Sequence, residues 1–217
     1  MENPWLKIPS ETPYVLEIDR ESIERYNAGQ ANPDRKIDTS LIPEPFIGNP
    51  STAKLVLLNL NPGVAEDDAR AHARRDFRTA MLLNLRHESQ KYPFYPLDPG
   101  LSQTPCAQWW LRKTRRLVEE CGRERVANGL FVIEWFPYHS KKEPRGGVCE
   151  SQWYSWQLAK EMIEKRKCMV LMRSKDHWAV CDERLSESPL PNSRQNPAIT
   201  AANFGEDLFS RMRKALT

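Results

Sequence analysis

Two asparagines, a proline and a glycine directly follow an apolar run in the stretch LVLLNLNPG at positions 55–63. The run from Leu55 to Leu58 predicts a strand that is buried on both faces. The residues that follow end this strand in a turn. Open α/β sheets bind ligands at the carboxyl ends of their parallel strands, which makes Asn61 a candidate functional residue. The alternative is an ordinary turn built from common turn formers.

The histidines and cysteines form no metal-binding motif. The five cysteines are widely spaced without a CxxC pair, and the four histidines lack the HExxH and HxxxH spacings. We therefore expect reduced thiols, no metal and no cofactor. No GxSxG elbow, P-loop or GxGxxG turn is present. A generic α/β hydrolase is therefore the weakest of the functional hypotheses considered below.

Length and composition predict one globular domain. The chain has 217 residues, of which 40% are hydrophobic and 28% are charged. No apolar stretch approaches the roughly 20 residues that a membrane span needs. The first residues, MENPWLKIPSETPY, lack the basic start and apolar block of a signal peptide. We expect a cytoplasmic protein without a membrane partner.

The net charge of +3 permits a nucleic-acid partner without requiring one. Basic residues recur in two places, each of which is either a phosphate-binding face or a solvated helix surface. The first group is Arg70, Arg74, Arg75 and Arg78, and the second is Lys113, Arg115 and Arg116.

Strands alternate with helices along most of the chain. Residues 1–45 are rich in proline and polar groups and predict an arm packed on the core, with a short helix at 20–27. Thr104 and Pro105 open one helix as N-cap and first helical residue. The alternation predicts, for 46–217, a three-layer α/β/α sandwich around a central parallel four-stranded sheet. The expected strands cover 54–60, 129–136, 168–174 and about 188–193, and the expected helices cover 65–86, 104–121, 150–166 and the carboxyl-terminal residues.

The residues at the strand ends resemble motifs of the uracil-DNA glycosylase superfamily, most closely those of its mismatch-specific uracil/thymine glycosylases. The family's first motif reads roughly G-x-D/N-P-G/Y, and the matching residues here are 59–63, NLNPG. Its last motif reads H/N-P-S-x-L-S, and the matching residues are 196–200, NPAIT. The strands in GLFVIEWFPYHS and CMVLMRS resemble those between the two motifs. The resemblance implies the same fold over about residues 46–217.

The resemblance also implies roles for the matching residues. Asn61 stands where the family positions the water that attacks the sugar, and Asn196 where it faces the departing base. An amide can orient water but cannot deprotonate it, so the reaction is expected to be slower than with a carboxylate. A donor aimed at developing charge is typically worth roughly 3 kcal/mol. The alternatives are a turn hydrogen bond for Asn61 and a cap for Asn196.

Further residues are implied in binding. Leu60, Pro62 and Gly63 belong to the first motif, and Phe94 or Tyr95 offers an aromatic face on which a flipped base can stack. Core packing is the alternative role for these two aromatic residues, and we assign Trp109 and Trp110 to the core. In the last motif, the residues expected to contact nucleic acid are Pro197, Ala198, Ile199 and Thr200. Only Ile199 has the bulk of an apolar wedge that fills the gap left by a flipped base.

This sequence departs from the family at three positions. Asn59 replaces a glycine and adds a side chain where the backbone approaches the ligand, and Ala198 replaces a serine hydroxyl that contacts phosphate. Glu134 stands where the family reads the base with an asparagine. An ionised carboxylate only accepts hydrogen bonds, whereas uracil presents both a donor and an acceptor. Burial can keep Glu134 protonated, the ligand can present two donors as guanine does, or Glu134 can pair with an arginine.

We therefore expect Glu134 to contact a ligand for which unmodified uracil is not the best partner. The leading hypothesis is a hydrolase that cleaves the N-glycosidic bond of a flipped, damaged or mismatched base, with DNA as the expected partner. The second is a nucleotide-binding or nucleic-acid-binding module on the same fold that does not cleave. The oligomeric state is not predicted.

Overall fold

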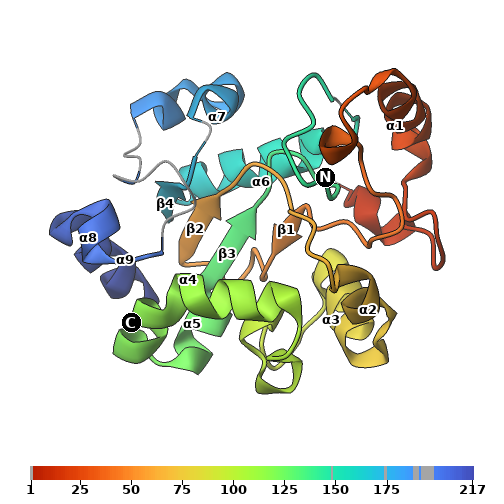
Figure 1. The fold of residues 1–217 in the computed structure, drawn as a ribbon. Helices are drawn as coiled ribbons and strands as arrows, with labels where there is room; N and C mark the ends of the chain where they lie inside the picture. Colours follow the sequence, from red (N-terminus) through yellow and green to blue (C-terminus); the bar gives the residue numbers. More distant parts are fainter. Residues whose placement is uncertain (1, 148, 174, 188–190, 192–197) are drawn as a thin grey trace.

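Short runs of branched and aromatic residues form one four-stranded sheet in the computed structural model, which describes residues 2–147, 149–173, 175–187, 191 and 198–217. The strand order is β1-β3-β2-β4. Every residue of β2 and β3 is buried, as expected for strands with both faces covered. Figure 1 shows α4 in front of the sheet and α6 behind it. The strands are β1 (Phe46–Ile47), β2 (Leu55–Leu58), β3 (Leu130–Ile133) and β4 (Cys168–Leu171).

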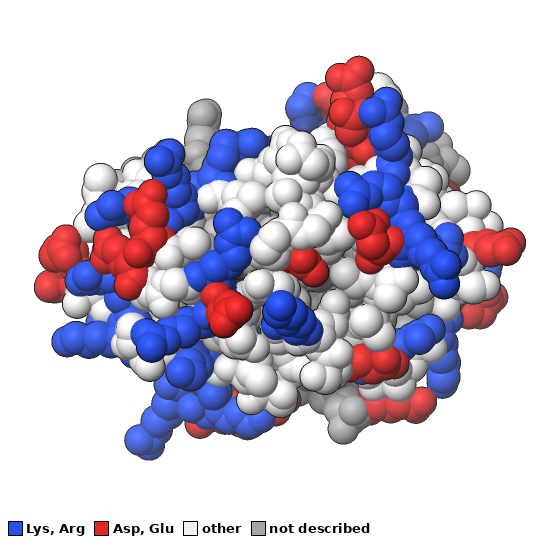
Figure 2. Space-filling model, turned by 90° about the horizontal axis from the view of Figure 1, so that it is seen from below, with Lys and Arg blue, Asp and Glu red and all other residues white. Residues whose placement is uncertain are grey.

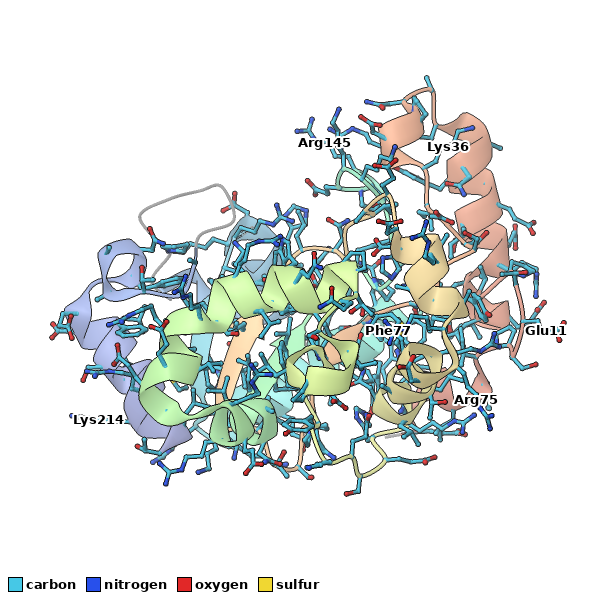
Figure 3. All side chains as sticks on the ribbon, turned by 60° about the horizontal axis from the view of Figure 1, so that its bottom comes forward. Glu11, Lys36, Arg75, Phe77, Arg145 and Lys214 are labelled. Atoms are coloured by element: carbon cyan, nitrogen blue, oxygen red, sulfur yellow. The ribbon has the colours of Figure 1, made fainter. Side chains whose placement is uncertain are left out.

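The helices surround this sheet (Figure 1). Phe77 of α3 points inward whereas Arg75 on the same helix reaches the surface (Figure 3). The α-helices are α1 (Glu17–Gly29), α2 (Asp68–Ala73), α3 (Arg75–Leu85), α4 (Pro105–Cys121), α5 (Arg123–Gly129), α6 (Gln152–Glu164), α7 (Lys175–Cys181), α8 (Ala201–Phe204) and α9 (Glu206–Leu216). Short 3₁₀ helices are η1 (Pro4–Lys7), η2 (Pro33–Arg35), η3 (Tyr95–Leu97), η4 (Pro99–Leu101) and η5 (Glu183–Glu187).

The sheet is mixed, so the prediction of an all-parallel sheet is wrong. β2 pairs in parallel with both β3 and β4, whereas β1 pairs with β3 in the antiparallel direction, Phe46 opposite Ile133. Gly48 follows β1 at a φ of 109°, and a Cβ there would lie 2.5 Å from the carbonyl oxygen of Leu130. A side chain would therefore block this edge pairing. The strand predicted at about 188–193 lies largely outside the described residues.

Local signals placed the longest helices well. The Thr104 hydroxyl accepts a hydrogen bond from the Ala107 amide at 3.3 Å, which confirms the predicted N-cap of α4. The single helix predicted at 65–86 is instead two helices, because Arg74 adopts an extended conformation at φ −70° and ψ 130° between α2 and α3. α2 ends at Ala73 and α3 begins at Arg75, so a single residue separates the two helices.

The amino-terminal segment is tied into the core by buried polar contacts. The Tyr138 hydroxyl donates to Asp19 Oδ2 at 2.6 Å, and the Ser151 amide donates to Asp19 Oδ1 at 2.9 Å. Trp5 is fully buried, and its ring packs edge-on against Tyr138. Asp19 therefore joins α1 to two segments that lie more than a hundred residues away in the chain.

All five cysteines are free thiols. Within the described ranges no helix is both long enough and apolar enough to cross a membrane.

Candidate functional site

A pocket of about 800 Å³ opens beside the carboxyl ends of β2 and β3. Its wall combines the loop after β2, the start of α4, the segment after β3 and the end of β4. Polar and charged groups make up much of this wall, and two tryptophans contribute aromatic surface. The residues used below are Glu44, Asn59, Asn61, Asp68, His72, Cys106, Trp109, Trp110, Arg112, Glu134, His139, Ser140 and Arg173.

Backbone hydrogen bonds extend beyond the ends of the two central strands and align the loops that follow them. The Phe136 amide donates to the Leu60 carbonyl at 2.8 Å, and the Ser140 amide donates to the Pro62 carbonyl at 3.2 Å. The Trp135 amide donates to the Asn59 carbonyl at 3.3 Å. Residues 59–62 therefore run beside 135–140, which places the polar side chains of both segments in one pocket.

Asn61 is anchored through its amide nitrogen. Nδ2 donates to Ser140 Oγ at 3.0 Å, to the Ser140 carbonyl at 3.2 Å and to the Pro62 carbonyl at 3.0 Å. Only the last of these lies within its own turn, so the side chain does more than stabilise that turn. Because these carbonyls fix the amide orientation, Oδ1 is left as an acceptor with no partner among the described residues.

Glu134 is buried at the end of β3 and lines the same pocket. Asn59 Nδ2 donates to its Oε1 at 2.9 Å, whereas Oε2 is buried without a hydrogen-bond partner in the described part of the chain. Burial raises the pKa of Glu134 to about 8, against the opposing effects of the Asn59 hydrogen bond and the charge of Arg173. The neutral acid therefore predominates at pH 7, with its hydrogen on Oε2. A buried O–H without an acceptor calls for a ligand.

The contacts of Glu134 bear on the pairing with an arginine that the sequence left open. No ion pair between Glu134 and an arginine forms within 4.0 Å among the described residues. The partner is instead Asn59, the side chain that replaces the expected glycine. Asn59 therefore occupies space beside the carboxyl group and orients it.

A second carboxyl group, Glu44, lies at the wall of the pocket and comes from the segment before β1. Its carboxyl accepts from the Tyr95 hydroxyl and from Cys106 Sγ at 3.8 Å. Burial raises the pKa of Glu44, and burial also raises the pKa of Cys106 well above that of an ordinary thiol. Cys106 is therefore an uncharged donor and a poor nucleophile.

Two histidines join the segment before β1 to the loop after β2. His139 Nδ1 lies 2.7 Å from the Gly63 carbonyl oxygen, and its Nε2 lies 3.0 Å from that of Ile42. His72 Nδ1 accepts from the Ile42 amide at 3.0 Å. Burial lowers the pKa of His72 to about 3, so this ring is neutral and able to accept. These contacts hold the wall of the pocket in place.

The predicted stacking residues do not reach the pocket. Phe94 is fully buried and packs edge-on against Trp110, with ring centroids 5.0 Å apart. Tyr95 is equally buried and bonds Glu44. Trp109 and Trp110 of α4 line the pocket. Trp110 also belongs to the buried core, as the sequence predicts, whereas Trp109 packs against that core and is only partly buried. Trp109 is the more exposed of the two and is available for stacking.

The other residues of the first motif lie in the same pocket. Leu60, Pro62 and Gly63 all line the pocket with Asn59 and Asn61. A Cβ on Gly63 would meet no atom within 4 Å, so this glycine borders open space.

The last motif is only partly described, since Asn196 and Pro197 lie outside the described residues. The Ala198 carbonyl accepts a hydrogen bond from Asn203 Nδ2 at 2.7 Å, and the Thr200 hydroxyl accepts from the Asn203 amide at 3.4 Å as the cap of α8. Ile199 is fully buried in the core. It therefore does not project as the predicted wedge, because an inserted side chain must be exposed.

Several pocket residues were missed by sequence reasoning. The available signal was the stretch PYHS at 137–140, which follows β3 as NLNPG follows β2 and contains His139 and Ser140. Glu44 and Trp109 carried no such signal, because only the packing of distant segments brings them to the pocket.

On the face seen in Figure 2, basic and acidic side chains are interspersed. Lys36 and Arg145 lie on the same side of the molecule in Figure 3, where Lys142 pairs with Asp34 at 2.8 Å. No group of three or more metal-ligating side chains is present in the described part of the chain.

Comparisons of the chain with models of protein families, with curated proteins and with solved structures found no match.

Proposed function

We propose that this protein is a hydrolase that cleaves the N-glycosidic bond of a nucleobase held in the pocket beside β2 and β3. The observation that carries the proposal is the buried, neutral carboxyl group of Glu134, whose Oε2 lacks a partner among the described residues, in the same pocket as the anchored amide of Asn61. The roles given to Asn61 and Glu134 are those that the resemblance to uracil-DNA glycosylases implies.

A neutral carboxyl group offers one donor and one acceptor side by side. It matches a base edge in which a carbonyl lies next to an N–H, as in uracil, thymine and hypoxanthine. A base that presents two adjacent donors is matched only by the ionised form. The preferred bases are therefore those with a carbonyl beside an N–H, whereas reading of guanine through its adjacent N1–H and amino donors is disfavoured below pH 8. This set includes unmodified uracil, so the proposal departs from the expectation from the sequence that uracil is not the best partner.

The reaction follows from the two positions. Asn61 Oδ1 accepts from a water and orients it toward the sugar carbon, where a bond forms as the bond to the base breaks. The bonding electrons leave with the base, and the hydrogen bond from Glu134 Oε2 to the base carbonyl strengthens as negative charge develops. The water's proton is finally carried by the released base. Asn196 remains a predicted second donor.

The test is the formation of abasic sites in duplexes that carry uracil, mismatched thymine, hypoxanthine or xanthine, revealed by alkaline cleavage. We expect cleavage of at least one duplex by the wild-type protein and a loss of about 100-fold or more in Asn61→Ala. Asn128→Ala, an exposed asparagine on α5, is the matched control. No cleavage of any duplex, or equal activity in both variants, would contradict the proposal.

A second candidate is a module that binds a nucleobase without cleaving it. Asn59 favours it, because its amide already engages the carboxyl group that would read the base. Binding of a uracil duplex without abasic sites would support this candidate over the hydrolase.

A further inference from the structure

Three cationic side chains gather at one side of the pocket. Arg112 of α4 and Arg173, two residues after the end of β4, both line it. Lys113 is close enough to both arginines to feel their charge, and its Nζ lies 4.9 Å from the centroid of the Trp109 ring. Burial lowers the pKa of Lys113 to about 8, and the nearby positive charges of Arg173 and Arg112 act in the same direction.

The arginines of this cluster differ from the other basic residues of α4. Arg115 pairs with Glu119 at 2.9 Å, and Arg116 pairs with Glu120 at 2.8 Å. For Arg115 and Arg116, these ion pairs favour the solvated helix surface over the phosphate-binding face, the two alternatives that the sequence left open. Among the described residues, by contrast, Arg112 and Arg173 form no ion pair within 4.0 Å.

Two guanidinium groups in one pocket, each without an ion-pair partner among the described residues, repel one another. A bound anion at this position would remove that repulsion. Two exposed guanidinium groups are suited to a phosphate, which they can contact through paired N–H donors. The backbone also brings the last motif to this place, since the Ile199 amide donates to the Lys113 carbonyl at 2.9 Å.

We propose that Arg112 and Arg173, flanked by Lys113, bind a phosphate group attached to the nucleoside whose base occupies the pocket. The proposal rests on the proposed function for the identity of the base, but the anion site itself does not. The phosphate belongs either to a polynucleotide backbone or to a free nucleotide.

The experiment measures binding at pH 6.5, where Glu134 is neutral. The ligands are 2′-fluoro-2′-deoxyuridine, its 5′-monophosphate and an oligonucleotide containing it, because the fluorine disfavours the cationic state of glycosidic cleavage. The double variant Arg112→Ala/Arg173→Ala is compared with Arg115→Ala/Arg116→Ala, which removes the same charge from the paired face of α4. Thermal unfolding of both variants establishes that they are folded.

A polynucleotide phosphate predicts that the test variant binds the oligonucleotide at least about tenfold more weakly than the wild type. The slope of log K against log salt falls by about 1 for each phosphate that the variant no longer neutralises. A free nucleotide predicts that the wild-type preference for the monophosphate over the nucleoside disappears in the test variant. In both cases the control variant Arg115→Ala/Arg116→Ala is expected to bind as the wild type does.

The proposal is overturned if the test and control variants behave alike with both phosphate-bearing ligands. Failure of the proposed function has a different signature. In that case the nucleoside does not bind and no abasic sites form, while an oligonucleotide without uracil still distinguishes the two variants.

Discussion

Burial of Glu134 determines which hydrogen bonds the pocket offers. An ionised carboxylate would present two acceptors, whereas the neutral form that burial favours presents a donor on Oε2 beside the acceptor Oε1. Asn59 fixes which oxygen accepts. In the proposed function, a carboxyl group takes over the part that an amide plays in the proteins that the sequence resembles.

Glu134 also makes stability depend on pH. Its pKa rises from 4.5 in the unfolded chain to about 8 in the fold, so its stabilising contribution is complete below pH 4.5 and is lost as pH rises to 8. Relative to Glu134→Gln, the wild-type free energy of unfolding should fall by about 1.4 kcal/mol per pH unit between pH 5 and 8. Urea denaturation across this range measures the difference.

Glu119→Gln is the control for this titration. Hydrogen bonds from Arg115 and Arg116 lower the pKa of Glu119. Any pH dependence of stability that Glu119 causes is therefore confined to pH values below about 4.5. If the unfolding free energies of the wild type and Glu134→Gln differ by the same amount at every pH from 5 to 8, Glu134 does not titrate in this range.

At the level of elements, α4 connects the fold to the site. It begins at the Thr104 cap and carries Trp109, Trp110 and Arg112 along the pocket. Its start and length follow from local signals in the sequence, as do the two central strands. Local signals did not reveal the break at Arg74, where neither proline nor glycine interrupts the helix, nor the two-residue strand β1, which is too short to show a pattern.

The cap of α4 gives a prediction at this scale. Thr104→Ala removes the acceptor for the Ala107 amide and should lower the free energy of unfolding by about 1 kcal/mol. Thr104→Ser keeps the hydroxyl group and should be destabilised less. Chemical denaturation of the two variants measures the difference, and equal destabilisation would mean that the methyl group rather than the cap is important.

Across the whole molecule, the pocket depends on contacts between distant parts of the chain. Residues 1–45 contribute Glu44 and Arg35 to its wall. The rule that ligands bind at strand ends led from the sequence to Asn61, because that rule concerns sheet topology, and the resemblance of the strand-end motifs led to Asn59 and Glu134. Neither route could reveal Glu44 or Trp109, whose positions follow from packing, nor that Ile199 is buried. For Phe94 and Tyr95 the sequence left stacking and core packing open, and both side chains lie in the core.

The contact between Tyr138 and Asp19 should stabilise this assembly. Tyr138→Phe leaves Asp19 Oδ2 and the Leu16 amide without their buried partner, and should lower the free energy of unfolding by about 1–3 kcal/mol. Tyr26→Phe removes a partly exposed hydroxyl and serves as the control. Equal unfolding free energies for the two variants would show that Asp19 does not hold the amino-terminal segment in place.

The central claim is that a neutral Glu134 reads a base in the pocket, and calorimetry of free uracil binding from pH 6 to 9 tests it most directly. With a pKa of about 8, the neutral fraction falls by roughly tenfold between pH 7 and 9, and the wild-type affinity should fall with it. Glu134→Gln should bind uracil equally well across the range. Absence of uracil binding, or the same pH dependence in both proteins, would contradict the account.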